Sequence, residues 1–171
     1  MPARTPRVYV DACVYVNVLK HEAGFWRDAL KVLVAVERGD ITLVASRLLV
    51  VEAGRFAGDR DRSAVDEQMR RYLEVPGTEW AELDLIVSRE ARRLSWEHQL
   101  RDAGDAVHLA TALRRRCDYF VSNDKAFPYG STLDHTKIVR PQVLWDSTTD
   151  DVTIDDMPDL EPPPSDAAPE A

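Results

Sequence analysis

The stretch from residue 100 to residue 127 constrains the fold most, because it joins a capped helix to a short strand that ends on an acid. Asp102 can accept backbone N–H groups as an N-cap, and Asp105 then falls in the first turn of an Ala- and Leu-rich helix with a basic end. The apolar run within residues 118–122 predicts a buried strand that stops at Asn123-Asp124. Helix starts and strand ends meet at one edge of an open α/β sheet, so this unit predicts a crevice lined by carboxylates.

The remainder of the chain alternates between segments typical of strands and segments typical of helices. Strands are expected at residues 7–16, 41–45, 78–83, 118–122 and 137–139, and helices at 25–38, 46–56, 61–73 and 84–100. This alternation favours an α/β fold with a mainly parallel central sheet of four or five strands and helices on both faces.

Composition divides the chain into a folded domain, residues 1–149, and an acidic tail, residues 150–171. The tail holds six Asp, two Glu and five Pro but no Lys or Arg, so we expect it to be disordered. Without those eight acids the domain has 22 basic and 22 acidic residues, so the net charge of −8 does not exclude a polyanionic partner. No apolar run approaches the roughly 20 residues that span a bilayer, and no signal-peptide pattern is present, so we expect a cytoplasmic protein with no membrane partner.

Four acids stand out, although each taken alone has an ordinary structural explanation. Asp11 interrupts a run of Val and Tyr, where an unpaired carboxylate would cost several kcal/mol, but a strand-end Asp can also bond neighbouring backbone amides. Glu52 can lie on a solvated helix face, Asp105 can serve the helix dipole, and Asp124 can be a turn residue.

The expected layout brings these four acids to one edge of the sheet. Asp11 and Asp124 end strands, Asp105 opens a helix, and Glu52 lies on the helix after the second strand. Carboxylates gathered there repel one another unless a cation compensates them. Oxygen ligands without a Cys/His cluster favour Mg²⁺ or Mn²⁺ over Zn²⁺, and such a cluster serves phosphodiester hydrolysis.

Four segments, taken in order, resemble a PIN-domain ribonuclease of the VapC toxin type. They read VYVDACVYV, SRLLVVEAGR, DAGDAVHLATAL and DYFVSNDKAF, and the resemblance spans about residues 7–139. It implies a three-layer α/β/α sandwich and an acidic metal site formed by Asp11, Glu52, Asp105 and Asp124. Ser122 would orient a metal ligand or a phosphate, and Asp102 would add an accessory role to its function as a cap.

The same resemblance implies an activity and partners. The chain would be a Mg²⁺- or Mn²⁺-dependent endoribonuclease, the toxin of a type II toxin–antitoxin pair, with RNA as substrate, a VapB-like antitoxin and a homodimeric state. Apolar helical segments at residues 32–36 and 48–51 would supply a groove for the antitoxin.

One departure from the family pattern and two alternative functions qualify this interpretation. Many relatives carry Asn or Ser two residues after the first Asp, whereas this chain has Cys13. His108 is interpreted as an aromatic packing position rather than a site residue. Two alternatives stay open: a PIN domain without toxin or catalytic activity that binds or processes RNA, and a Mg²⁺-dependent phosphatase with a strand-end Asp nucleophile. The phosphatase usually needs a second acid at the position of Cys13.

Overall fold

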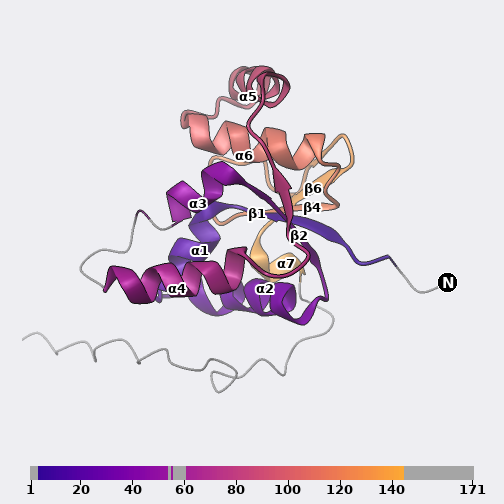
Figure 1. Ribbon diagram of the computed structural model, residues 1–171. Helices are drawn as coiled ribbons and strands as arrows, with labels where there is room; N and C mark the ends of the chain where they lie inside the picture. The colour runs from indigo at the N-terminus through magenta and orange to yellow at the C-terminus, as the bar shows by residue number, and fades with distance from the viewer. Residues whose placement is uncertain (1–3, 54, 56–60, 145–171) are drawn as a thin grey trace, which may run out of the picture.

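A six-stranded sheet lies between two layers of helices in the computed structural model, which describes residues 4–53, 55 and 61–144 (Figure 1). From one edge to the other, the strands are β3 (Glu79–Ala81), β2 (Thr42–Ser46), β1 (Arg7–Val10), β4 (Tyr119–Val121), β6 (Thr136–Val139) and β5 (Thr132–Leu133). The first five are parallel, and β5 pairs antiparallel with β6. The predicted α/β/α sandwich with a mainly parallel sheet is therefore confirmed, and β5 adds a short sixth strand.

The helices divide between the two faces of the sheet (Figure 1). One face carries α5 (Leu85–His98) and α6 (Ala103–Arg114), which pack against each other. The other carries α1 (Ala12–Leu19), α2 (Trp26–Arg38), α3 (Arg47–Ala53), α4 (Arg62–Leu73) and α7 (Pro141–Leu144). None of the described helices is long and apolar enough to cross a membrane.

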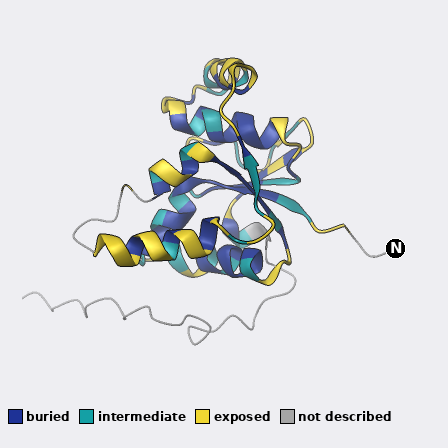
Figure 2. Cartoon of the chain, in the orientation of Figure 1, coloured by how far each residue is buried: buried dark blue, intermediate teal, exposed yellow. Residues whose placement is uncertain are grey.

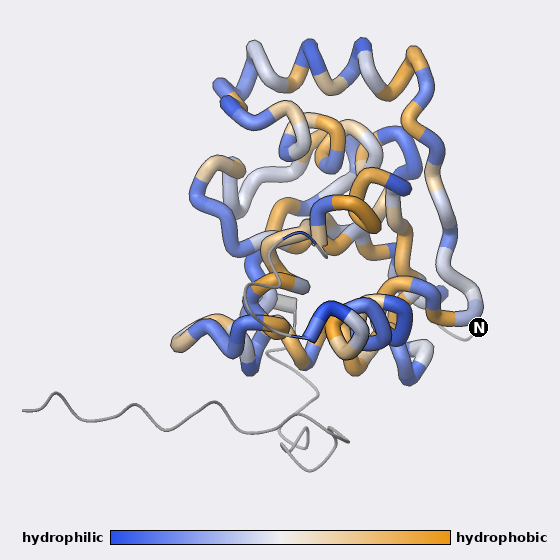
Figure 3. The backbone as a smooth tube through the Cα atoms, turned by 60° about the vertical axis from the view of Figure 1, so that its left-hand side comes forward, coloured by the Kyte–Doolittle hydropathy of each residue, from blue (hydrophilic) through white to orange (hydrophobic). Residues whose placement is uncertain are grey.

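Each face of the sheet has its own hydrophobic core, and β1 contributes to both. Val8 and Val10 pack with α1 and α2, whereas Tyr9 between them packs with α5 and α6, and all three side chains are fully buried. Successive side chains of a strand point to opposite faces, so four residues suffice to anchor both layers. Figure 2 shows burial concentrated in this central region, and Figure 3 shows the hydrophilic residues gathered on the outer helices.

The predicted strand at residues 7–16 is wrong after Val10, because the chain turns there into α1. Asp11 has extended backbone angles and caps the new helix by accepting a 2.8 Å hydrogen bond from the backbone N–H of Ala12. The Val- and Tyr-rich run continues, but Val14 and Val18 are now one helical turn apart and both reach the core. The other predicted helices and strands are present, with ends shifted by a few residues.

The predicted docking groove is also wrong in part. Residues 32–36 are buried within α2, with exposed fractions of 7% or less, because α2 is covered by the core and by its contacts with α1, α4 and α7. On α3, by contrast, Val50 and Val51 are 47% and 63% exposed. The acidic tail predicted at residues 150–171 lies outside the described residues.

Candidate functional site

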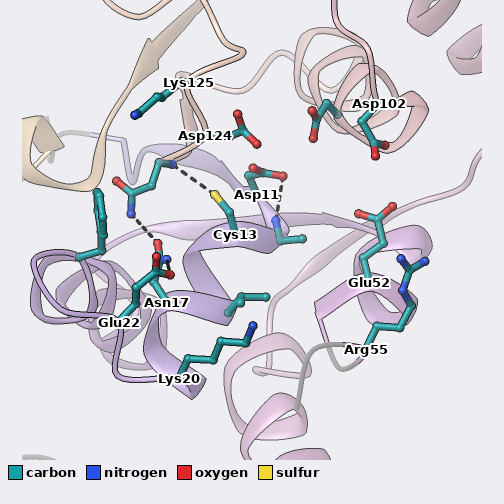
Figure 4. A pocket seen from close by; sticks show the side chains of 15 residues that line it. Asp11, Cys13, Asn17, Lys20, Glu22, Glu52, Arg55, Asp102, Asp124 and Lys125 are labelled. Carbon is teal, nitrogen blue, oxygen red and sulfur yellow. Dashed lines mark hydrogen bonds between the residues drawn. The ribbon is translucent and has the colours of Figure 1, made fainter. Parts of the chain in front are cut away.

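A cavity of about 660 Å³ opens at the edge where the parallel strands end, and it contains all the acids singled out from the sequence. Asp11 follows β1, Asp124 lies three residues beyond β4, Glu52 is on α3, and Asp105 is in the first turn of α6. The lining residues are Asp11, Ala12, Cys13, Val16, Asn17, Lys20, Glu22, Phe25, Glu52, Arg55, Asp102, Asp105, Asn123, Asp124 and Lys125. Segments separated by more than 100 residues thus meet in one place, as Figure 4 shows.

Asp11 is fixed by hydrogen bonds to the end of β4 and to the residue that follows it. Its backbone N–H bonds the carbonyl of Val121 at 2.9 Å, and its Oδ2 accepts a 2.8 Å bond from the hydroxyl of Ser122. The side chain is only 2% exposed. The Ser122 Oγ in turn accepts the backbone N–H of Asp124 at 3.0 Å, so one buried serine ties the first and last acids together.

Cys13 completes this arrangement instead of disrupting it. Since the Ser122 proton goes to Asp11, the Cys13 thiol must donate its own proton to Ser122 Oγ, 3.2 Å away. The Cys13 sulfur also accepts the backbone N–H of Asn123 at 3.2 Å. Burial, and then the charge of Asp11, raise the pKa of the thiol well above its usual value, so it stays protonated and able to donate.

Glu52 is oriented by a buried histidine that the sequence reasoning assigned to packing. His108 Nε2 lies 2.6 Å from Glu52 Oε2, and His108 Nδ1 lies 2.7 Å from the hydroxyl of Tyr9, which donates to Ser46 Oγ. Because a carboxylate only accepts hydrogen bonds, the Nε2 of His108 carries a proton and donates it. Burial lowers its pKa, but the bond to Glu52 and the neighbouring carboxylates outweigh burial, and the net shift is upward.

Gly104 makes room for the Glu52 carboxylate at the start of α6. A Cβ at position 104 would overlap with Glu52 Oε1, and it would lie 3.0 Å from Oδ1 of Asp102. Asp102 is the predicted N-cap, accepting the backbone N–H of Gly104 at 2.6 Å. A glycine in the first turn of the helix thus lets α3 and α6 bring their acids close together.

The carboxylates of the cavity act electrostatically on one another. Asp105 is half-buried, and burial together with the charges of Asp11, Asp124 and Asp102 raises its pKa to about 7. An added cation would relieve this repulsion, and the acids offer the oxygen donors that Mg²⁺ and Mn²⁺ prefer. Among the described residues, no three Asp, Glu, His or Cys side chains are grouped closely enough to hold a metal ion.

Cationic side chains lie around the acidic centre. Lys20, Arg55 and Lys125 line the same cavity, and in Figure 4 Lys125 lies on the side of Asp124, Lys20 below Asn17, and Arg55 beside Glu52. The cavity thus has acids at its centre and cations at its margin. This charge pattern suits a nucleic-acid backbone with one phosphate at a metal ion in the centre and neighbouring phosphates beside the cations.

The sequence thus placed Asp11, Glu52, Asp102, Asp105, Ser122 and Asp124, all of which the structure brings to this region. The prediction from sequence missed the roles of His108, Gly104 and Cys13. The spacing of His108, three residues after Asp105, was a signal for a shared helix face. Its contact with Glu52 spans 56 residues of sequence, and no local pattern indicates it.

Comparisons with known proteins agree with this geometry. The family model described as PIN domain matches residues 7–126. Among solved structures, the chain is similar to a toxin–antitoxin complex from Klebsiella pneumoniae, with 17% sequence identity, a TM-score of 0.55, and coverage of 78% of this chain and 97% of the other. It is also similar to VapBC2 from Rickettsia felis bound to a DNA fragment from their promoter, with 11% identity, a TM-score of 0.56, and coverage of 78% and 98%. No curated protein sequence gives a significant match. At these identities the structural likenesses support the fold.

Proposed function

Since this chain belongs to the PIN domain family, we propose that it is a metal-dependent endoribonuclease that hydrolyses RNA phosphodiester bonds. The observation that carries this proposal is the meeting of Asp11, Glu52, Asp105 and Asp124 in one cavity at the carboxyl edge of the sheet. Four acids from four separate elements have no structural need to share a cavity, and their mutual repulsion is unfavourable without a cation.

Mg²⁺ or Mn²⁺ would be held by the carboxylates of Asp11, Asp105 and Asp124, with Glu52 acting directly or through water. Such a cation supplies a water of lowered pKa and neutralises charge on the scissile phosphate. All the donors are oxygen atoms, and no thiolate is available, because Cys13 remains a thiol bonded to Ser122.

The protein's own residues orient these carboxylates and manage protons. Asp11 accepts Ala12 N–H on one oxygen and Ser122 O–H on the other, which fixes its plane and leaves a lone pair on each oxygen. His108 holds Glu52 by donating from Nε2. In the metal-free protein Asp105 has a pKa of about 7, so binding of a cation at neutral pH would release a proton from this carboxyl.

The test compares RNA cleavage by the wild type with cleavage by two variants in which one Asp of the cavity is replaced by the neutral Asn. With Mg²⁺ or Mn²⁺ present we expect endonucleolytic cleavage, which EDTA abolishes, and we expect Asp11→Asn and Asp124→Asn to reduce the rate by at least ~100-fold. Asp134→Asn is the matched control, because Asp134 is exposed, lies outside the cavity, and has a positive φ of 52° that Asn tolerates.

Cleavage by Asp11→Asn at the wild-type rate would refute the proposed mechanism. Metal-dependent RNA binding by the wild type without cleavage would support the alternative function, a catalytically inactive PIN domain that binds RNA.

We propose further that the nuclease is the toxin of a type II toxin–antitoxin pair in the cytoplasm and that a VapB-like antitoxin inhibits it. Of the two similar solved structures described above, one is a toxin–antitoxin complex and the other is VapBC2 bound to promoter DNA. Exposed Val50 and Val51 directly precede Glu52, so α3 carries exposed apolar side chains as well as an acid of the cavity. A partner segment with hydrophobic anchors and one Arg would match both, because a guanidinium can bridge two carboxylates.

Expression of the chain alone, compared with expression beside its genomic neighbour, tests this assignment. We expect a growth defect that Asp11→Asn removes, and co-purification with a small partner. Replacing both Val50 and Val51 with Ser should weaken capture of that partner while RNA cleavage persists. Absence of both the growth defect and the partner would refute the toxin assignment and leave the nuclease chemistry standing.

A homodimer is the third part of the proposal. The outer face of α5 carries the exposed apolar side chains Leu85, Ile86 and Trp96, which are 53–74% exposed. A second copy would cover them, as exposed apolar patches commonly serve association. Light scattering of the wild type should give twice the mass of one chain. The double variant Ile86→Lys/Trp96→Lys should give the mass of one chain. Identical masses for the variant and the wild type would remove this face from the interface.

A further inference from the structure

Arg140 lies at the carboxyl edge of the sheet, at the end of the strand next to β4. It directly follows β6, and β6 pairs with β4 so that Val139 lies opposite Val121. The backbone N–H of Ser122 bonds the carbonyl of Val139 at 3.1 Å, which brings Arg140 level with the serine that holds Asp11. Arg140 is not among the residues that line the acidic cavity, so it lies beside the cavity and not within it.

An aromatic ring, and not a carboxylate, restrains the exposed Arg140 side chain. The central carbon of its guanidinium lies 4.7 Å from the ring centroid of Tyr129. Within the described residues, the Arg140 side chain forms no hydrogen bond and no ion pair. Stacking on a ring therefore restrains this cation without using its N–H groups, which remain available to an anion.

Tyr129 joins this cation to the loop that carries Asp124. The Tyr129 hydroxyl donates to the backbone carbonyl of Asp124, and the half-buried ring packs against the core between the sheet and the helices α5 and α6. The backbone N–H of Gly130 bonds the carbonyl of Ile138 at 3.0 Å, which ties the loop to β6. A single fixed ring thus separates Arg140 from Asp124, so the structure itself sets the spacing between the cation and the acid.

Lys125 supplies a second cation next to the same acid. It directly follows Asp124, it is exposed, and it forms no ion pair with another described residue. In Figure 4, Lys125 lies on the side of Asp124 away from Glu52 and Arg55. The acidic centre repels a polyanion, so a nucleic-acid backbone that reaches it needs cations close by. Lys125, one residue from Asp124, and Arg140, one aromatic ring from it, can provide them.

We propose that Arg140, supported by Tyr129 and assisted by Lys125, binds the RNA phosphate that neighbours the scissile one on the Asp124 side of the cavity. This inference rests on the proposed ribonuclease function and identifies how the substrate strand is held. A guanidinium offers several N–H donors to one phosphate, and phosphates carry the charge of RNA whatever its sequence. The site therefore recognises the backbone and not a base.

The salt dependence of RNA binding tests this site without cleavage. Fluorescence anisotropy with a single-stranded RNA, measured in the Asp11→Asn background with Mg²⁺, gives the Kd at a series of salt concentrations. Arg140→Gln should weaken binding about fivefold. It should also lower the slope of log Kd against log salt concentration by roughly 0.7, the value for one phosphate contact on a single strand. Arg140→Lys should retain most of the slope, because it keeps the charge.

A matched control and a modified RNA show whether the contact is local. Arg92 also lies over an aromatic ring, 5.6 Å from the centroid of Trp96, but it is on α5 and outside the cavity, so Arg92→Gln should leave the slope unchanged. In the RNA, one phosphate at a time is replaced by a neutral methylphosphonate. The replacement next to the cleaved linkage should weaken binding, but it should not weaken binding to Arg140→Gln any further, because both changes remove the same contact. Additive losses at every phosphate would overturn the site.

Cleavage kinetics separate failure of this inference from failure of the proposed function. Arg140→Gln should act on KM, because the phosphate that it binds does not react. Tyr129→Phe keeps the ring under Arg140 but loses the bond to Asp124, so it should act on kcat.

Unchanged RNA affinity, salt slope and KM in Arg140→Gln would overturn the site, even if RNA is cleaved. Weaker capture of a protein partner with unchanged RNA binding would assign Arg140 to an acidic segment of that partner and would also overturn it. A salt slope that depends on Arg140, without RNA cleavage, would uphold the site and refute the nuclease.

Discussion

At the scale of single residues, the charge of one carboxyl group links the pH dependence of stability to the metal site. The folded protein holds the Asp105 proton up to a pKa of about 7, whereas the unfolded chain releases it near the ordinary value of 3.8. Because the folded state binds the additional proton, this group stabilises the metal-free protein at low pH, and its contribution is lost as pH rises from about 4 to 7.

Asp105→Asn should therefore gain stability relative to the wild type as the pH increases. Asn resembles the protonated acid and does not titrate, so the difference in Tm between variant and wild type should grow between pH 4 and pH 7 in EDTA. Thermal melts followed by circular dichroism measure this difference. Asp134→Asn should show a constant offset, and a constant offset for Asp105→Asn would mean that its proton is not held in the folded state.

Asp124→Asn should affect stability in opposite directions with and without metal. The amide oxygen can keep the bond that Asp124 Oδ1 accepts from Ala126, while one of the repelling charges is removed. We expect a Tm at or above that of the wild type in EDTA, and a smaller rise than the wild type shows when Mg²⁺ or Mn²⁺ is added. A full metal-induced rise in this variant would exclude Asp124 as a ligand.

At the scale of elements, the approach of α3 to α6 depends on the absence of a side chain at Gly104. Gly104→Ala should gain roughly 0.5–1 kcal/mol of stability from the higher helix propensity of Ala. Displacement of the Glu52 carboxylate acts in the opposite direction. It should still lower RNA cleavage, because the new methyl group overlaps the Glu52 carboxylate.

A double-mutant cycle identifies the route of that effect. If Gly104→Ala acts through Glu52, it should cost little further activity in a Glu52→Gln background. Chemical denaturation supplies the stability values for all four proteins. Additive losses of activity would show that position 104 acts through α6 itself and not through Glu52.

The elements also show what the sequence can and cannot indicate. Periodicity located α2, α4, α5 and α6, because apolar faces, the Asp caps of α4, α5 and α6, and the Gly39 stop of α2 are local signals. The β1–α1 junction was missed because Val and Tyr fill both elements, so only the Asp11 cap marks the change. The acids of the site were predictable from the order of the elements, since parallel strands place their ends together. The pairing of Glu52 with His108 was not, because it depends on tertiary packing.

At the scale of the whole molecule, the predicted domain boundary can be tested by truncation. Residues 150–171 carry few apolar side chains in the sequence, so their contribution to burial should be small. A chain that ends at residue 147 should keep its Tm within a few degrees, corresponding to roughly 1 kcal/mol or less. It should also bind RNA more tightly at low salt, because eight acidic residues are removed. A much larger loss of Tm would show that the tail packs on the domain.

The pairing of β1 with β4 determines when during synthesis the acidic cavity can form. Asp11 is synthesised before its partners Val121 and Ser122, which follow 110 and 111 residues later, and the parallel β1–β4 ladder cannot form until then. Contacts of such long sequence separation form late in folding. A nascent or prematurely terminated chain that lacks β4 therefore carries no assembled acidic cavity.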